Sequence, residues 1–190
     1  TTENCVGAPP PFDYEALDHY AAMIAECRRA GLEPLVTLHH FVHPAWLGID
    51  AWLHWETADL FATFVTETAR YLNRRLVEDY ALPPIRDYIT VNEPNMLVIN
   101  TYFGHQFPSA PPAGFQNLPV AFSQLLRAHI LAYNCIHDLY TEQGWPAPRV
   151  SVNNHCSDVY ASDKLWLDLL FLRPKGIAHA EVDSHLRLQA

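Results

Sequence analysis

The stretch IRDYITVNEPN, residues Ile85–Asn95, joins a run of strand-forming residues to an abrupt polar end. β-Branched and aromatic residues dominate its first part and predict a buried strand over Ile85–Val91. Pro94 cannot donate a hydrogen bond to a neighbouring strand, and a proline biases the residue before it toward an extended backbone. We therefore expect the strand to end at the rim of a sheet, with Glu93 extended there. Because a carboxylate at the mouth of a buried strand is costly to desolvate, Glu93 needs either partners or a function.

The composition is that of an ordinary globular protein. The chain has 190 residues, of which 49% are hydrophobic, and it shows no low-complexity segment. The net charge of −9 is spread along the sequence, which argues against nucleic acid or an anionic membrane as a partner. No run approaches the roughly 20 apolar residues of a membrane span. Residues 1–15 lack the features of a secretory leader and the four cysteines are widely spaced, so we expect reduced thiols and a cytoplasmic location.

Predicted helices and strands alternate along the chain. Apolar periodicity and helix-end signals predict helices over residues 14–30, 118–143 and 163–172, and a further helix capped by Thr57. Strands are expected over residues 32–40, 85–91 and 149–154. A repeat of helix and strand in this order implies right-handed crossovers and a parallel sheet, which is an α/β architecture.

Each predicted strand ends in polar residues. These are His39 and His40 after the first strand, Asn92 and Glu93 after the second, and Asn153, Asn154 and His155 after the third. In a (β/α)8 barrel the functional groups come from the ends of several strands, whereas in a doubly wound sheet they gather at one switch point. The pattern therefore favours part of a (β/α)8 (TIM) barrel. A complete barrel needs at least about 200 residues, so we expect residues 1–190 to be a single, incomplete barrel domain.

The motifs at these strand ends resemble those of family 1 glycoside hydrolases, the β-glucosidase family. TLHHFVHPAWL, residues Thr37–Leu47, looks like the family's third-strand motif, and ITVNEPN, residues Ile89–Asn95, is similar to its acid/base motif T-x-NEP. The segments YEALDHY before the first strand and LLRAHILAYN at residues 125–134 also agree. NEP alone occurs in other families of the same barrel clan, but the two motifs together are specific. The resemblance runs from Tyr14 to about Leu172, which corresponds to the third to fifth β/α units.

This resemblance implies a retaining hydrolase that cleaves β-glycosidic bonds of small-molecule glycosides by double displacement, without a cofactor or metal. Glu93 matches the general acid/base of that mechanism. The residues that would contact the sugar are His40, Phe41, Asn92 and Asn154. Of these, Asn92 would hold the 2-hydroxyl, a contact that strengthens in the transition state. The position on the third strand could equally correspond to Asn153 or His155.

The second carboxylate of a retaining site has no convincing counterpart in the sequence. Such a site needs a nucleophile roughly 5–5.5 Å from the acid, and the family carries it in a T-E-N-G motif on a later strand. Glu3 lies in a TEN triplet, but Cys5 replaces the glycine and the triplet precedes the wrong helix; Asp158 follows the third strand. We expect the nucleophile to lie outside this chain, and the remaining barrel segments or another chain to complete the site. The isolated segment should then be inactive.

Two other interpretations remain open. A non-catalytic, carbohydrate-binding or structural partial barrel could keep the acid without the nucleophile. A metal-dependent barrel hydrolase is suggested by the H-H-x-x-H pattern of His39, His40 and His43. Successive side chains of a strand point to opposite faces, so His39 and His40 cannot both enter a barrel, and we do not expect a metal site.

Overall fold

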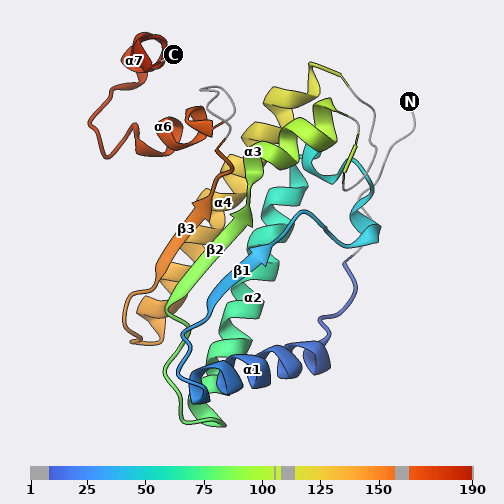
Figure 1. Cartoon of the computed structure of the whole chain (residues 1–190), viewed down its shortest axis with the longest axis vertical. Coiled ribbons are helices and arrows are strands. Elements are labelled where there is room, and N and C mark those ends of the chain that lie inside the picture. Colours follow the sequence, from blue (N-terminus) through green and yellow to red (C-terminus); the bar gives the residue numbers. More distant parts are fainter. Residues whose placement is uncertain (1–8, 105, 108–113, 157–162, 190) are drawn as a thin grey trace.

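The structure is a computed structural model that describes residues 9–104, 106–107, 114–156 and 163–189. Its centre is a parallel sheet of three strands in the order β1 (Leu35–His39), β2 (Asp87–Asn92) and β3 (Arg149–Asn153). Helices α2 (Glu56–Glu78) and α4 (Asn117–Glu142) lie side by side against one face of this sheet (Figure 1). The predicted parallel α/β architecture is confirmed.

The remaining helical elements are short or peripheral. They are α1 (Tyr14–Arg29), α3 (Pro94–Leu97), α6 (Leu165–Phe171), α7 (Val182–Gln189), the π-helical turn Val98–Phe103, and the 3-10 turns Ala45–Leu47, Ala51–Leu53 and His179–Glu181. Helix α6 packs through the buried Trp166, whose ring meets that of Phe122 on α4. No helix among the described residues is long and apolar enough to cross a membrane.

Two predicted element boundaries are wrong. The N-cap of α2 is Trp55, and Thr57 lies inside the first turn, where its hydroxyl donates to the Ala51 carbonyl. That carbonyl also accepts the His54 N–H of the preceding 3-10 turn, so the Thr57 hydroxyl adds a second hydrogen bond to it instead of capping α2. The first strand begins at Leu35 rather than residue 32, because the Leu32 N–H bonds back to the last turn of α1 and Pro34 has no N–H to offer a ladder.

The core lies between the sheet and the pair α2 and α4. Every residue of the central strand β2 is buried, whereas β1 and β3 alternate between half-buried and exposed residues along most of their length. A polar cluster crosses this core: Asn73 on α2 donates to the hydroxyls of Tyr88 and Tyr140 at 2.9 Å each and accepts the Ile85 N–H at 2.7 Å. Burial raises the pKa of Tyr88 well above its usual value and that of Tyr140 to about 12, so both hydroxyls stay neutral. The cluster joins both helices to the start of β2.

Several large apolar side chains remain exposed on the described part of the molecule. Leu35 at the start of β1 is 59% exposed, and Tyr20 and Met23 on α1 are also exposed. Strands β1 and β3 are the two outer strands of the sheet (Figure 1). Exposed apolar side chains thus occur at the β1 edge of the sheet and on α1, and they also occur on other elements, among them Phe64 on α2, Ile130 on α4 and Leu188 on α7.

Candidate active site

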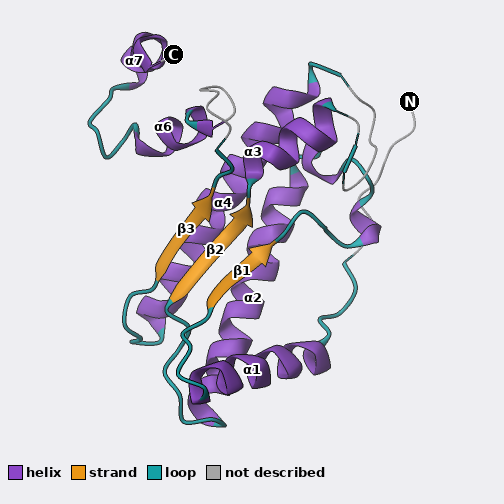
Figure 2. Cartoon of the chain, viewed as in Figure 1, coloured by secondary structure: helices purple, strands orange, loops and turns teal. Residues whose placement is uncertain are grey.

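The carboxyl ends of all three strands lie along the same edge of the sheet (Figure 2). His40 and Phe41 follow β1, Glu93 follows β2, and β3 ends at Asn153. This shared edge is where a parallel α/β sheet presents groups to a ligand.

A bulge shapes the end of the central strand. Ile89 pairs with Ser151 and Asn92 with Asn153, so β2 has one more residue than β3 across this interval. Such a bulge re-aims the side chains that follow it. The buried Asn92 accepts a hydrogen bond from the Asn153 side-chain amide through its Oδ1 at 2.8 Å, and this bond fixes the orientation of the Asn92 amide.

Glu93 has a left-handed backbone, with φ 42° and ψ 57°. The expectation that Pro94 would keep it extended is therefore wrong. The chain enters α3 directly at Pro94, so the reversal from strand to helix falls on Glu93, whose carbonyl accepts the Leu97 N–H while its own N–H donates to the Asn153 carbonyl at 2.9 Å. This conformation costs a non-glycine residue about 1–2 kcal/mol. Phe41, at the end of β1, also has a positive φ of 67°, and strained residues of this kind cluster at functional sites.

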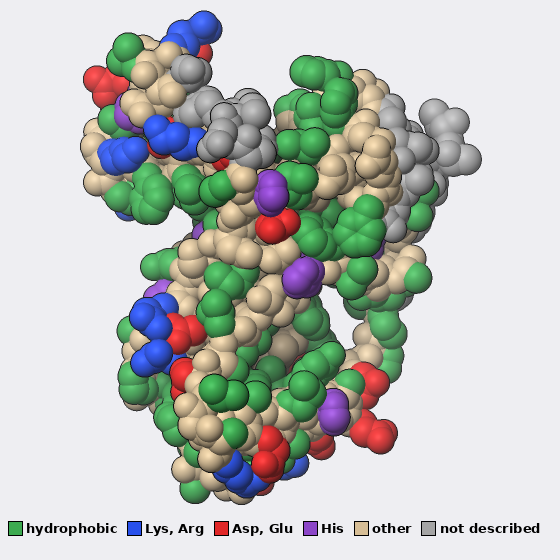
Figure 3. All heavy atoms as spheres, in the orientation of Figure 1, with side chains coloured by type: hydrophobic (Ala, Val, Ile, Leu, Met, Phe, Trp, Pro, Cys, Tyr) green, Lys and Arg blue, Asp and Glu red, His purple; other side chains and the backbone are tan. Residues whose placement is uncertain are grey.

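The Glu93 carboxylate is only partly shielded from solvent. Its side chain is 32% exposed, and its Oε1 lies 3.9 Å from Nδ1 of His155, which is 45% exposed. Figure 3 shows an acidic side chain between two histidine side chains near the middle of the visible face. A carboxyl group placed this way is accessible to a substrate that enters from the strand ends.

The candidates on β1 and β3 occupy different surroundings. His40 is exposed and lies edge-on to the half-buried Phe41, whose ring also meets Phe107. The Asn154 side-chain amide donates to the Asp163 carbonyl at 2.7 Å, whereas Asn153 contacts Asn92. Of the residues proposed for the third strand, the structure thus brings Asn153 and His155 next to the Asn92–Glu93 pair. Glu3 and Asp158, weighed above as second carboxylates, lie outside the described residues.

Sequence reasoning missed Asn95, although it lies within the opening stretch. This side chain is almost completely buried and bonds to the backbone of His155, donating to its carbonyl at 2.9 Å and accepting its N–H at 3.2 Å. The sequence feature that could have indicated it is the polar residue directly after the NEP triplet. Its partner, however, is more than fifty residues away in the sequence, and only the parallel pairing of β2 and β3 brings the two together.

His39 is separated from this group of residues. It is 6% exposed and lies edge-on to Trp52 and Phe61, with ring centroids 5.3 and 6.0 Å away. Burial, with smaller effects from His43 and His40, lowers its pKa to about 3. The contrast between the buried His39 and the exposed His40 agrees with the expected alternation. Within the described ranges, no three His, Cys, Asp or Glu side chains are grouped so that they could hold a metal ion.

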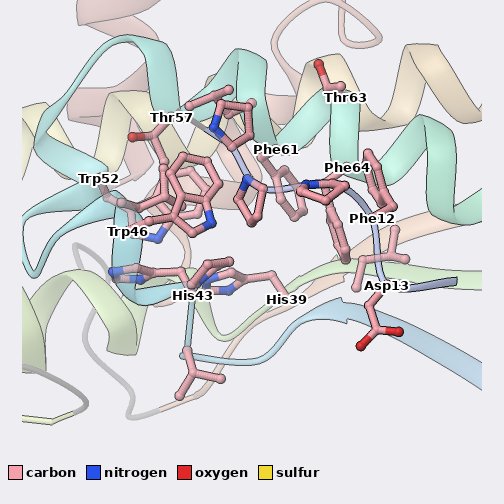
Figure 4. Close-up of a pocket in the computed structure, with 18 residues that line it drawn as sticks. Phe12, Asp13, His39, His43, Trp46, Trp52, Thr57, Phe61, Thr63 and Phe64 are labelled. Carbon is pink, nitrogen blue, oxygen red and sulfur yellow. The ribbon is translucent and has the colours of Figure 1, made fainter. Parts of the chain in front are cut away.

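A cavity of about 420 Å³ lies beside β1, between the segment Pro9–Asp13 and α2 (Figure 4). Its walls are mainly apolar and aromatic, including Phe12, Trp52 and Phe61, and Glu93 and Asn92 do not line it. Sugar recognition needs several polar groups that converge on hydroxyls, so this cavity is poorly suited to hold a glycoside. We place the candidate site at the strand ends instead.

Comparison with known proteins agrees with the motifs. Residues 7–164 match the sequence pattern of glycosyl hydrolase family 1. The chloroplastic galactolipid galactosyltransferase of Arabidopsis thaliana is 26% identical over 181 residues, covering 90% of this chain and 25% of the relative. The 6-phospho-β-galactosidase of Lacticaseibacillus rhamnosus is 29% identical over 164 residues, covering 78% and 32%. The β-glycosidase from Pyrococcus horikoshii superposes with a TM-score of 0.63 at 23% identity, covering 87% of this chain and 36% of that structure.

The chain spans about a quarter to a third of the length of these curated relatives. Its three parallel strands and their helices superpose on part of the barrel glycosidase, so the fold is part of a (β/α)8 barrel. The family pattern covers most of the sequence and includes both strand-end motifs. This chain therefore belongs to glycosyl hydrolase family 1.

Proposed function

We propose that this chain supplies the acid/base half of a retaining β-glycosidase active site that acts on small-molecule β-glycosides. The observation that carries the proposal is the position of Glu93. Its carboxyl group follows the central parallel strand, on a left-handed backbone fixed by β3, and remains open to solvent at the strand ends. Glu93 protonates the glycosidic oxygen as the bond to the leaving group breaks, and then takes a proton from the water that hydrolyses the glycosyl-enzyme.

The groups around Glu93 support a sugar-binding role. Asn92, held by Asn153, presents an amide next to the acid, where it can hold the 2-hydroxyl of the sugar. His40 and Phe41, at the end of the adjacent strand, line the innermost subsite in this proposal. Asn154 stays a further candidate contact, and Asn153 joins it because it lies against Asn92.

We propose that the nucleophile comes from barrel segments other than those described here, so residues 1–190 are one incomplete barrel domain. The exposed apolar residues Leu35, Tyr20 and Met23 support a need for further strands and helices along the edge of β1. These segments belong to the rest of a longer polypeptide or to another chain. We also keep the expectation of a cytoplasmic location, to which the free thiols of Cys27, Cys135 and Cys156 are suited.

The test compares two leaving groups. The 190-residue chain alone should not hydrolyse p-nitrophenyl β-glucoside or β-galactoside, whereas the chain completed with the missing β/α units should. In the completed protein, Glu93→Gln should lower kcat/KM for alkyl glycosides far more than for activated aryl glycosides, which depart with little protonation. Glu142→Gln, at the exposed end of α4, is the control. Equal losses on both substrates would remove Glu93 from the acid role, and binding without any turnover would indicate a carbohydrate-binding relative.

A further inference from the structure

The end of β3 and the residues after it are hydrogen-bonded to the end of β2 and the residues after it at successive points. The Asn153 side chain and carbonyl bond to the Asn92 side chain and the Glu93 N–H. Further along both segments, the Asn95 side chain bonds to both backbone groups of His155. The Glu93 backbone therefore lies between two fixed connections.

The connection made by Asn95 fixes the place of His155. Asn95 is 2% exposed, and its amide oxygen and nitrogen both bond to His155. These two bonds restrain the His155 backbone, so its imidazole moves mainly by rotation about its own side-chain torsions. From this position Nδ1 of His155 reaches 3.9 Å from Oε1 of Glu93. That separation is longer than a hydrogen bond, so a small displacement of the segment decides whether the two groups interact.

We infer that Asn95 is a positioning residue for Glu93, which acts by holding His155 beside the carboxyl group. Asn95 does not touch the substrate; it fixes the imidazole that faces one carboxyl oxygen. The inference rests on the proposed function, because the orientation of this carboxyl group matters for a reaction only if Glu93 exchanges a proton with a glycoside. It adds a residue of this chain to the proposed site.

The competing explanation is that Asn95 only stabilises the fold, and the chain offers a matched control for it. Asn73 is also fully buried and also holds backbone, since it accepts the Ile85 N–H. It does so at the opposite end of β2 from Glu93. Replacement of either asparagine by alanine removes buried hydrogen bonds and should lower stability. Only the Asn95 replacement should alter the relation between Glu93 and His155.

The first measurement is independent of activity. In the 190-residue chain, Glu93→Gln should shift the imidazole NMR resonances of His155. In an Asn95→Ala background the same substitution should shift them by less than half as much, whereas in an Asn73→Ala background the full shift should remain. An equal shift in all three backgrounds overturns the inference. If Asn95→Ala fails to fold, the comparison is repeated with Asn95→Asp, whose carboxylate can accept the His155 N–H but cannot donate to the His155 carbonyl, and an undiminished shift in that background overturns the inference. An unprotected His155 amide in hydrogen exchange of the wild-type chain also overturns it.

The second measurement separates this inference from the proposed function. In the completed barrel, Asn95→Ala should lower kcat/KM for alkyl glycosides roughly tenfold more than for activated aryl glycosides. If Glu93→Gln leaves turnover unchanged, the proposed function fails regardless of the NMR result. If turnover depends on Glu93 but Asn95→Ala lowers it equally for both substrates, the proposed function stands and the positioning role of Asn95 is refuted.

Discussion

Two buried histidines make the stability of this chain sensitive to pH. Burial lowers the pKa of His39 to about 3 and that of His129, which bonds to Thr90, to about 4. In the unfolded chain each takes up a proton near its ordinary pKa of 6.5. Below pH 6.5 the unfolded state therefore binds more protons than the folded state. As the pH falls from 6.5 to about 3, His39 alone then lowers the free energy of unfolding by about 1.4 kcal/mol for each pH unit.

Replacing His39 with phenylalanine should remove its share of this pH dependence. The new ring would meet the same aromatic neighbours, Trp52 and Phe61, without a group to protonate. Between pH 6.5 and pH 5 the free energy of unfolding should fall by about 2 kcal/mol less in His39→Phe than in the wild type. Urea unfolding at the two pH values measures this difference. His19→Phe, at an exposed position, is the control. A wild-type-like pH dependence in His39→Phe would show that His39 is not the group responsible.

At the scale of secondary structure, the central strand is held to its helices by a polar cluster. The Tyr140 hydroxyl on α4 donates to the Ile85 carbonyl and accepts a hydrogen bond from Asn73 on α2. Because all of these groups are buried, Tyr140→Phe should lower the free energy of unfolding by about 1–3 kcal/mol through unsatisfied partners. Tyr133→Phe, on an exposed position of the same helix, should change it little. Denaturant unfolding of both variants makes the comparison; equal effects would mean that the cluster contributes nothing specific.

The sequence predicted the elements better than their ends. Periodicity located the main helices and all three strands, since burial of an apolar face dominates over ten or more residues. The errors lie at positions where a single local contact determines the element boundary or the backbone conformation. The Thr57 hydroxyl donates to a carbonyl of the preceding turn, and Glu93 takes a left-handed backbone because α3 begins at the next residue. In the candidate site, Asn92 and Glu93 were found by motif, whereas the contribution of Asn95 depends on pairing between strands that are distant in the sequence.

At the scale of the whole molecule, the open edge of the sheet predicts self-association of the isolated chain. β1 is an outer strand, and its Leu35 is 59% exposed. Unpaired strand edges with apolar residues template contacts with other chains, and a lysine on such an edge disfavours them. Leu35→Lys should therefore shift the 190-residue chain toward monomer in sedimentation velocity experiments. Leu188→Lys, an equally drastic change on the exposed face of α7, should not. A wild-type chain that is monomeric at high concentration would contradict this prediction.

The left-handed backbone of Glu93 has a consequence for protein engineering. Glycine adopts this conformation without steric cost, although it also makes the unfolded chain more flexible. The free energy of unfolding of Glu93→Gly should therefore be up to about 1 kcal/mol higher than that of Glu93→Ala. The alanine variant keeps the backbone strain and also lacks the carboxylate. Thermal melts of the two variants measure the difference, and a less stable glycine variant would contradict it. A screen of this chain for heat resistance alone would accordingly tend to select against the proposed catalytic acid, so such a screen has to hold Glu93 fixed.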